Sequence, residues 1–84
     1  MAYFVYLLIS KHNNKYISYV GCTNNLKKRV YLHNNSKGAK FTKGRYWKIA
    51  YSKKYDTKSI ALKEEYKLKK NYNLRKRIKN RFNI

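Results

Sequence analysis

The chain of 84 residues has no proline, three glycines, one cysteine and only three acidic side chains. The single cysteine, Cys22, excludes a disulfide within the chain, and the widely spaced His12 and His33 leave too few ligands for a structural zinc site. A lone thiol is typical of a reducing environment, so we expect an intracellular protein, cytoplasmic or nuclear. The apolar run at residues 3–9 is too short to cross a bilayer, and we expect no membrane segment.

The scarcity of acids leaves a large excess of positive charge. Lysine and arginine together number 22, which gives a formal net charge of +19. This balance favours a polyanionic partner, and nucleic acid is the strongest candidate because neutralising phosphates releases counterions. A membrane surface or an acidic protein stays open as an alternative. A bias of the genome toward lysine codons would explain the lysines but not the missing acids.

The apolar and turn-forming residues predict an α+β domain with the order β-β-α-β-α-α. Strands are expected at residues 3–9, 16–21 and 47–51, with a turn at 11–15. Helices are expected after caps at Thr23 or Asn24 and at Asp56-Thr57, and from Leu74 to Phe82. Helical spacing assigns to the core Ile60, Ala61, Leu68 and Tyr72. We therefore expect one domain, residues 1–84, in which helices flank a small three-stranded, mainly antiparallel sheet.

Two tripeptides on the expected hairpin carry a family resemblance. They are Phe4-Val5-Tyr6 and Tyr19-Val20-Gly21, and a polar cap and a helix with Arg29 and then His33 follow them. This order resembles the GIY-YIG nucleases, whose two signature triplets lie on a hairpin. The segment Leu62 to Lys67 resembles the family's segment that carries its metal-binding glutamate.

The resemblance extends from Tyr3 to about Lys70. It is closest to the compact branch that includes small bacterial proteins and the catalytic domain of a eukaryotic nuclease that cuts branched DNA. It implies a metal-dependent endonuclease that hydrolyses DNA phosphodiester bonds, with branched, flap or junction DNA as the substrate, in repair or recombination. Because the only acids are Asp56, Glu64 and Glu65, we expect one Mg²⁺ or Mn²⁺ ion that keeps most of its waters.

The resemblance also implies roles for single residues. Glu65 is the expected metal ligand, Tyr6 the general base or water-orienting group, and Tyr19 a supporting group on water or phosphate. Periodicity alone does not separate Glu65 from Glu64, and both could be surface acids paired with nearby lysines. Either tyrosine could instead pack in the core with its hydroxyl at the edge, an alternative that carries more weight for Tyr19 than for Tyr6.

Arg29 and His33 lie four residues apart, on one face of the expected helix. Arg29 suits a phosphate because a guanidinium offers two parallel N–H donors. His33 can position water, accept a hydrogen bond from a tyrosine, or donate to the phosphate. The alternatives are a surface arginine and a histidine favoured by the helix C-terminus.

Further basic residues are expected to track the nucleic-acid backbone without reading bases. They are Lys27, Lys28, Lys37, Lys40, Lys43 and Arg45. Phe41, Tyr46 and Trp47 lie among them and can stack on exposed bases, although core packing is favoured for Trp47.

Two other hypotheses fit the composition. The chain could be a non-catalytic basic module that binds DNA, or an RNA- or ribosome-associated protein that binds structured RNA. A homodimer or a targeting subunit is a further partner to consider, because one nuclease core with one metal site is expected to cut one strand at a time.

Overall fold

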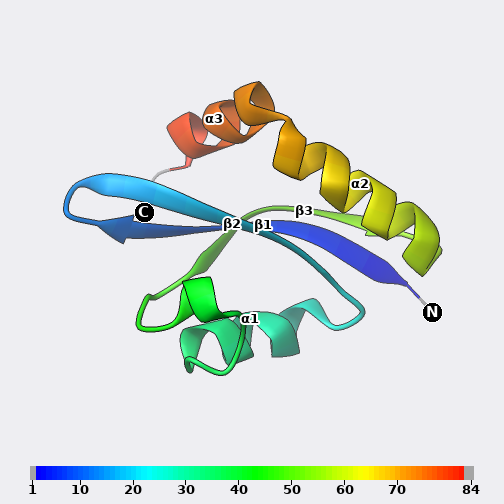
Figure 1. Cartoon of the computed structure of the whole chain (residues 1–84), viewed down its shortest axis with the longest axis horizontal. Helices are drawn as coiled ribbons and strands as arrows, with labels where there is room; N and C mark the ends of the chain where they lie inside the picture. Colours follow the sequence, from blue (N-terminus) through cyan, green and yellow to red (C-terminus); the bar gives the residue numbers. More distant parts are fainter. Residues whose placement is uncertain (1, 83–84) are drawn as a thin grey trace.

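In the computed structural model, which describes residues 2–82, three strands and three α-helices follow one another in the predicted order (Figure 1). Their bounds are β1 Tyr3–His12, β2 Lys15–Thr23, α1 Leu26–Asn34, β3 Lys48–Tyr55, α2 Lys58–Lys70 and α3 Tyr72–Arg81, with a short 3-10 helix, η1, at Lys40–Thr42. The α+β class is confirmed. The predicted domain range 1–84 includes residues 1, 83 and 84, which lie outside the described residues.

The sheet has the order β2-β1-β3, and both pairings are antiparallel. β1 and β2 meet in a turn of only two residues, Asn13 and Asn14, whose φ angles are 49° and 65°. Asparagine tolerates this left-handed backbone better than most residues, and such turns match the twist of a hairpin. The expected turn at residues 11–15 was therefore too long, and both strands continue further toward it.

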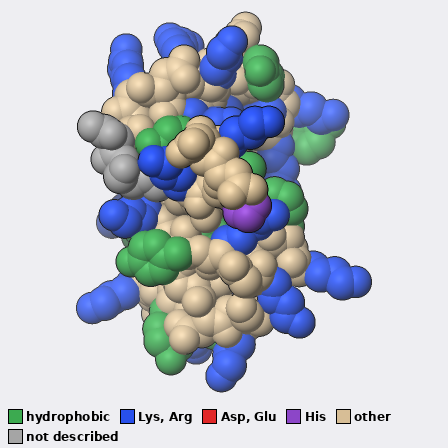
Figure 2. Space-filling view, turned by 90° about the vertical axis from the view of Figure 1, so that its left-hand side faces the viewer, with side chains coloured by type: hydrophobic (Ala, Val, Ile, Leu, Met, Phe, Trp, Pro, Cys, Tyr) green, Lys and Arg blue, Asp and Glu red, His purple; other side chains and the backbone are tan. Residues whose placement is uncertain are grey.

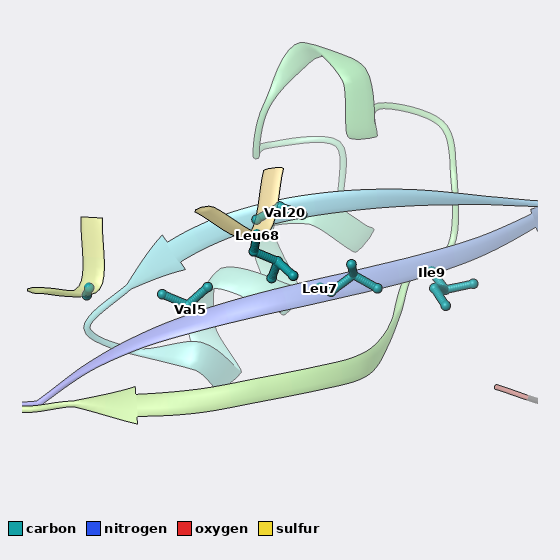
Figure 3. Close-up of a cluster of buried hydrophobic side chains, with 6 residues drawn as sticks. Val5, Leu7, Ile9, Val20 and Leu68 are labelled. Atoms are coloured by element: carbon teal, nitrogen blue, oxygen red, sulfur yellow. The ribbon is translucent and has the colours of Figure 1, made fainter. Parts of the chain in front are cut away.

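Helices cover both faces of the sheet, with α2 and α3 on one face and α1 with η1 on the other (Figure 1). Central strand β1 is therefore buried on both sides, which explains its nearly continuous apolar sequence. Its Val5, Leu7 and Ile9 pack with Val20 and Leu68 beneath the α2 face (Figure 3). Between them, Tyr6 and Leu8 point to the α1 face and pack with Trp47.

The expected core stripe of α2 was partly wrong. Ala61 and Leu68 are buried against the sheet, but Ile60 and Tyr72 are exposed. Ile60 lies one residue from Ala61, which turns it about 100° around the helix and away from the sheet. Tyr72 is out of phase because α2 ends at Lys70 and a new helix, α3, starts at Tyr72.

The cap of α1 is Asn25, not Thr23 or Asn24. The side chain of Asn25 accepts the backbone N–H of Lys28 at 3.1 Å, because β2 continues through Thr23 and delays the start of the helix. Thr23 instead accepts the N–H of Asn25 at 3.1 Å and shapes the turn before it. Thr57 caps α2 as predicted, by accepting the N–H of Ile60 at 3.2 Å.

Strand β3 starts after Trp47 and runs to Tyr55, so the expected strand at 47–51 was placed too early and too short. Trp47 is buried in the core, as the favoured interpretation had it. The third helix confirms the expected tail helix, and Leu74, Ile78 and Phe82 all pack against the core. Among the described helices, none has the length and apolar character needed to cross a membrane.

Candidate active site

The hydroxyl of Tyr6 meets Nε2 of His33 at 3.0 Å in the core between β1 and α1. The two side chains are 1% and 0% exposed. His33 is therefore not a surface histidine at a helix end, although it does lie in the last turn of α1. Of the three expected functions of His33, accepting a hydrogen bond from a tyrosine is the one that this geometry allows.

A second contact fixes which nitrogen of His33 carries the hydrogen. Nδ1 of His33 lies 2.8 Å from Oγ1 of Thr42, and this hydroxyl donates to the carbonyl oxygen of Ala39 at 2.7 Å. Because Thr42 has only one hydroxyl hydrogen, it must accept from Nδ1. His33 is therefore protonated on Nδ1, and its Nε2 accepts the hydroxyl hydrogen of Tyr6. Both ring nitrogens are occupied, so neither faces a phosphate or water.

The loop after α1 holds Thr42 in place through a chain of hydrogen bonds. The indole N–H of Trp47 donates to the carbonyl oxygen of Thr42 at 3.0 Å. The side chain of Asn34 in turn donates to the carbonyl oxygen of Trp47 at 3.1 Å and accepts the Trp47 backbone N–H. The last turn of α1 is thereby tied to the residue that orients His33.

Two of the three glycines leave room for the Tyr6–His33 pair. Gly21 lies opposite Tyr6 in the β1–β2 register, and a Cβ on it would lie closer than 3.0 Å to the phenol ring and hydroxyl. The phenol can therefore extend across β2. A Cβ on Gly38 would fall within 3.0 Å of the imidazole of His33. Thr42 and Gly38 are not among the site residues predicted from the sequence, and the scarcity of glycine is the only signal there that points to Gly38.

Arg29 and Glu65 line one hollow of about 370 Å³ at the β2 edge of the sheet. Asn24 and Lys58 contribute to the same wall. Arg29 comes from α1 and Glu65 from α2, so the two helices on opposite faces of the sheet bring opposite charges together at its edge. Tyr6 does not line this hollow, but Arg29 and Glu65 both lie close enough to influence its pKa.

The two neighbouring glutamates of α2 point to different places. Glu65 is 18% exposed and pairs with Lys69 at 3.7 Å. Glu64 pairs with Lys67 at 3.4 Å and lines another hollow, against Val5 and β3. Both glutamates therefore form the pairs with nearby lysines that the alternative interpretation predicted, but only Glu65 also shares a hollow with Arg29.

Burial and charge keep Tyr6 and His33 neutral at pH 7. Burial raises the pKa of Tyr6 to about 12, although Arg29 opposes the shift; the nearby Tyr19 and Glu65 add to it. Burial, helped by the charge of Arg29, lowers the pKa of His33 below its usual 6.5. These influences also show that Arg29, Tyr19 and Glu65 all lie close enough to act on Tyr6.

Tyr19 lies on the same face of the sheet as Tyr6 but not opposite it, because Tyr6 pairs with Gly21 and Tyr19 with Leu8. The ring of Tyr19 is centred 5.1 Å from that of His33. Its side chain lines a neighbouring hollow rather than the one shared by Arg29 and Glu65. The structure thus brings together Tyr6, His33, Arg29 and Glu65, with Tyr19 beside them.

Cys22, the single cysteine of the chain, is not suited to a catalytic role at this site. Cys22 lines the hollow from β2, and burial, together with the charge of Glu65, raises the pKa of its thiol. A raised thiol pKa keeps the unreactive protonated form.

Most of the predicted nucleic-acid-binding residues stand in solvent. Those exposed are Lys27, Lys28, Lys37, Lys40 and Lys43. Lys28 also lines a smaller hollow, of about 220 Å³, whose wall includes Arg29. Arg45 is half-buried, with its guanidinium carbon 5.6 Å from the centre of the Phe41 ring. Lysine and arginine side chains also stand out from the face that Figure 2 shows.

The donor set of the hollow limits the kind of metal ion it can hold. No cluster of three or more His, Cys, Asp or Glu suited to a metal occurs among residues 2–82. The carboxylate of Glu65 is a hard oxygen donor beside open space, which fits an ion of the Mg²⁺ type that keeps several waters and takes other oxygens from a phosphate. The residues present therefore fit a single hydrated divalent ion, and they do not fit zinc or a two-metal site.

Comparison with known proteins identifies the class. The GIY-YIG catalytic domain family matches residues 2–81, so the chain belongs to this family, which implies a nuclease that binds DNA. Within it, the chain is similar to the UPF0213 proteins, a small GIY-YIG group. It is 41% identical over 68 residues to UPF0213 protein OB0043 of Oceanobacillus iheyensis, a match that covers 80% of this chain and 76% of that protein.

Two further relatives belong to the same UPF0213 group. UPF0213 protein SSP2268 of Staphylococcus saprophyticus is 38% identical over 68 residues, with 80% of this chain and 79% of that protein covered. UPF0213 protein YazA of Bacillus subtilis is 41% identical over 69 residues, with 81% and 67% covered. No solved structure matches the chain. The names of these relatives state no substrate.

Proposed function

We propose that this protein is a divalent-metal-dependent endonuclease that nicks DNA, preferably at branches, flaps or junctions, during repair or recombination. One observation carries the proposal: Arg29 and Glu65 line one hollow at the sheet edge, and both lie close enough to the buried Tyr6 of the Tyr6–His33 pair to influence its pKa. Together they offer a cation for the phosphate, a carboxylate for a metal ion and a proton acceptor for water, and these groups support phosphodiester hydrolysis.

The phosphate binds at Arg29. A guanidinium donates two parallel N–H bonds to phosphate oxygens and stabilises the charge that develops on them during the reaction. Lys58 shares this hollow and Lys28 the one beside it, so both add positive charge along the path of the DNA backbone. These contacts fix the position of the strand without reading its sequence.

Tyr6 and His33 accept the proton of the attacking water as a pair. The hydroxyl oxygen of Tyr6 takes a proton from water while its own proton moves to Nε2 of His33, which is free to accept it. The imidazolium that forms is held by the Nδ1 hydrogen bond to Thr42. A bound phosphate offsets the charge of Arg29, which is one of the causes that lower the pKa of His33. The pair thus avoids a free phenolate, which a pKa of about 12 disfavours.

Glu65 would hold the divalent ion, Mg²⁺ or Mn²⁺, which would acidify a bound water and offset the charge that develops on the leaving oxygen. The carboxylate is paired with Lys69, but the Lys69 side chain is 54% exposed. Because the ammonium group of Lys69 belongs to a largely exposed side chain, it can move into solvent when a divalent ion takes its place at the carboxylate.

One such site cuts one strand in each event. Cutting both strands requires a second copy of the chain or a targeting subunit that presents the second strand. The net charge of +19 supports binding to DNA of any sequence, so the shape of the substrate rather than its sequence selects the cut.

A second candidate function is a non-catalytic module that binds DNA or structured RNA. It is favoured by the single carboxylate near Arg29 and by the high pKa of Tyr6. It predicts salt-sensitive binding without strand breaks under any metal condition. A binding competition between structured RNA and branched DNA distinguishes a DNA-binding module from an RNA-binding module.

The test is a panel of end-labelled linear, flap, fork and four-way-junction DNAs, incubated with and without Mg²⁺. Wild-type protein is expected to nick the branched substrates only when the metal is present. Glu65→Ala is expected to bind the same DNAs without cutting them. Equal cutting in chelator, or by the Glu65→Ala protein, would refute the metal role, and an absence of nicks under every condition would favour the binding module.

A further inference from the structure

A second hollow lies along the same edge strand, next to the one that holds Arg29 and Glu65. It measures about 250 Å³, and Tyr19, Phe41, Lys69 and Arg75 line it. Its wall combines aromatic rings with positive charges, which is the pattern of sites that hold single-stranded nucleic acid. The proposed chemistry does not use this hollow.

The two hollows are neighbours on β2. Val20 lines the second hollow and Cys22 the first, so the two sites are separated by two residues of one strand, about 7 Å along its axis. Lys69 connects them, because it lines the second hollow while its ammonium group lies 3.7 Å from the carboxylate of Glu65 in the first. A strand whose phosphate sits at Arg29 therefore reaches the second hollow within a nucleotide or two.

Phe41 supplies the apolar surface of the second hollow and is 52% exposed. Its ring lies nearly parallel to that of Tyr19, with 6.2 Å between the ring centres and 19° between the planes. The guanidinium of Arg45 lies over the Phe41 ring, 5.6 Å from its centre, and adds a second planar group. Aromatic rings and guanidinium planes are both surfaces on which an unpaired base stacks.

Arg75 supplies charge that the described residues do not balance. Its Nε is buried without a hydrogen-bond partner among residues 2–82, and its guanidinium carbon lies 5.8 Å from the centre of the Tyr72 ring. A buried donor without an acceptor is costly and calls for an explanation. With Lys69 beside it, Arg75 offers a backbone phosphate two cations in one hollow.

We propose that this second hollow binds an unpaired nucleotide adjacent to the scissile phosphate, with its base stacked on Phe41 and its phosphate held by Lys69 and Arg75. The inference rests on the proposed endonuclease function and deepens it, because a base must leave the duplex to stack there. A flap or branch presents such a base next to paired DNA, whereas a continuous duplex does not. The second hollow is thus the feature that selects branched over linear substrates.

The experiment measures binding in chelator, so that it does not depend on cutting. Fluorescence anisotropy gives the affinity of the full chain for a labelled flap DNA and for a fully paired duplex of equal length. Phe41→Ala is expected to weaken flap binding about tenfold to a hundredfold, the loss of one base-stacking contact, and to leave duplex binding within about twofold. Phe41→Trp is expected to keep the preference for the flap.

Tyr66→Ala is the matched control, because Tyr66 is also an exposed aromatic with a cation over its ring, but it lies on α2 outside both hollows. It is expected to leave both affinities unchanged. The proposal is overturned if Phe41→Ala weakens flap and duplex binding equally, or leaves flap binding unchanged. Strand breaks in Mg²⁺ are scored separately, so a protein that prefers flaps without cutting them disproves the nuclease function and not the nucleotide site.

Discussion

Tyr6 donates its hydroxyl hydrogen to Nε2 of a histidine that is itself fully buried, His33, at a distance of 3.0 Å. A phenol in this position has its proton already aimed at an acceptor. Because Thr42 holds the hydrogen of the other ring nitrogen, the direction of this bond is fixed before any substrate arrives. The pair is the part of the site from which the sharpest predictions follow.

Replacing Tyr6 by phenylalanine removes the hydroxyl and keeps the ring. Cleavage of flap DNA is expected to fall at least about 100-fold, the usual contribution of a general base, while DNA affinity is unchanged. The free energy of unfolding is expected to drop by about 1–3 kcal/mol, because Nε2 of His33 loses its donor. Tyr16→Phe, on the other face of the sheet, is the control; an equal loss of cleavage in both variants would contradict the assigned role of Tyr6.

Replacing Thr42 by valine removes the oxygen that accepts from His33 and preserves the shape of the side chain. The buried Nδ1 hydrogen is then unpaired, so the free energy of unfolding is expected to fall by about 1–3 kcal/mol. Nitrogen NMR of ¹⁵N-labelled histidine is expected to show His33 protonated on Nδ1 in the wild type and in Thr42→Ser, and a changed tautomer population in Thr42→Val. An Nε2-protonated wild type would disprove the proposed proton path.

Substituting the glycines tests how closely the backbone packs against Tyr6 and His33. Gly21→Ala and Gly38→Ala place a methyl group against Tyr6 and His33. The cleavage rate of both variants is therefore expected to fall by more than their lower free energy of unfolding explains. Gly44→Ala is the control, because Gly44 has a φ of 73° and nothing within 4 Å of its missing Cβ. It is expected to lose stability, by about 1 kcal/mol, while each folded molecule keeps full activity. Wild-type cleavage by the first two variants would refute the close fit.

Acid is expected to destabilise the fold through His33. Its pKa is lower in the folded chain than the usual 6.5, so the unfolded chain binds the proton more readily. The resulting stabilisation is present above about pH 6.5 and is lost as the pH falls through the folded-state pKa. Cleavage is expected to fall in the same range, because a protonated Nε2 no longer accepts from Tyr6.

Urea unfolding between pH 5 and 8 at constant ionic strength measures this dependence. His33→Gln is expected to flatten the change in unfolding free energy with pH, whereas His12→Gln, at the exposed end of the hairpin, is expected to keep it. A pH dependence that follows His12 instead would place the titrating group outside the site.

The sequence was sufficient for the elements because those depend on local patterns, and the family resemblance supplied the residues of the candidate site. The apolar run of β1 and the cap at Thr57 can be read along the chain, whereas the choice of Tyr6, Arg29 and Glu65 rests on the family resemblance. The predicted ends of the two hairpin strands were less accurate, because Asn13 and Asn14 form a tighter turn than their polar neighbours suggest.

Other features could not be predicted, because they depend on how distant segments meet. Thr42 and Gly38 lie in an irregular loop with no periodicity, and they contact His33 only once that loop folds back under α1. Periodicity likewise cannot separate Glu65 from Glu64; the position of α2 over the sheet turns one toward Arg29 and the other toward β3.

The different positions of Glu65 and Glu64 allow the most direct test of the proposed nuclease mechanism. Glu65→Gln and Glu64→Gln each remove one charge from adjacent positions of α2, and each breaks one pair with a lysine. On a flap DNA with Mg²⁺, Glu65→Gln is expected to bind normally and lose at least about 100-fold in cleavage rate, as the loss of a metal ligand or its electrostatic equivalent implies, while Glu64→Gln cuts like the wild type. Cleavage that survives in Glu65→Gln, or is lost equally in both variants, would contradict the account.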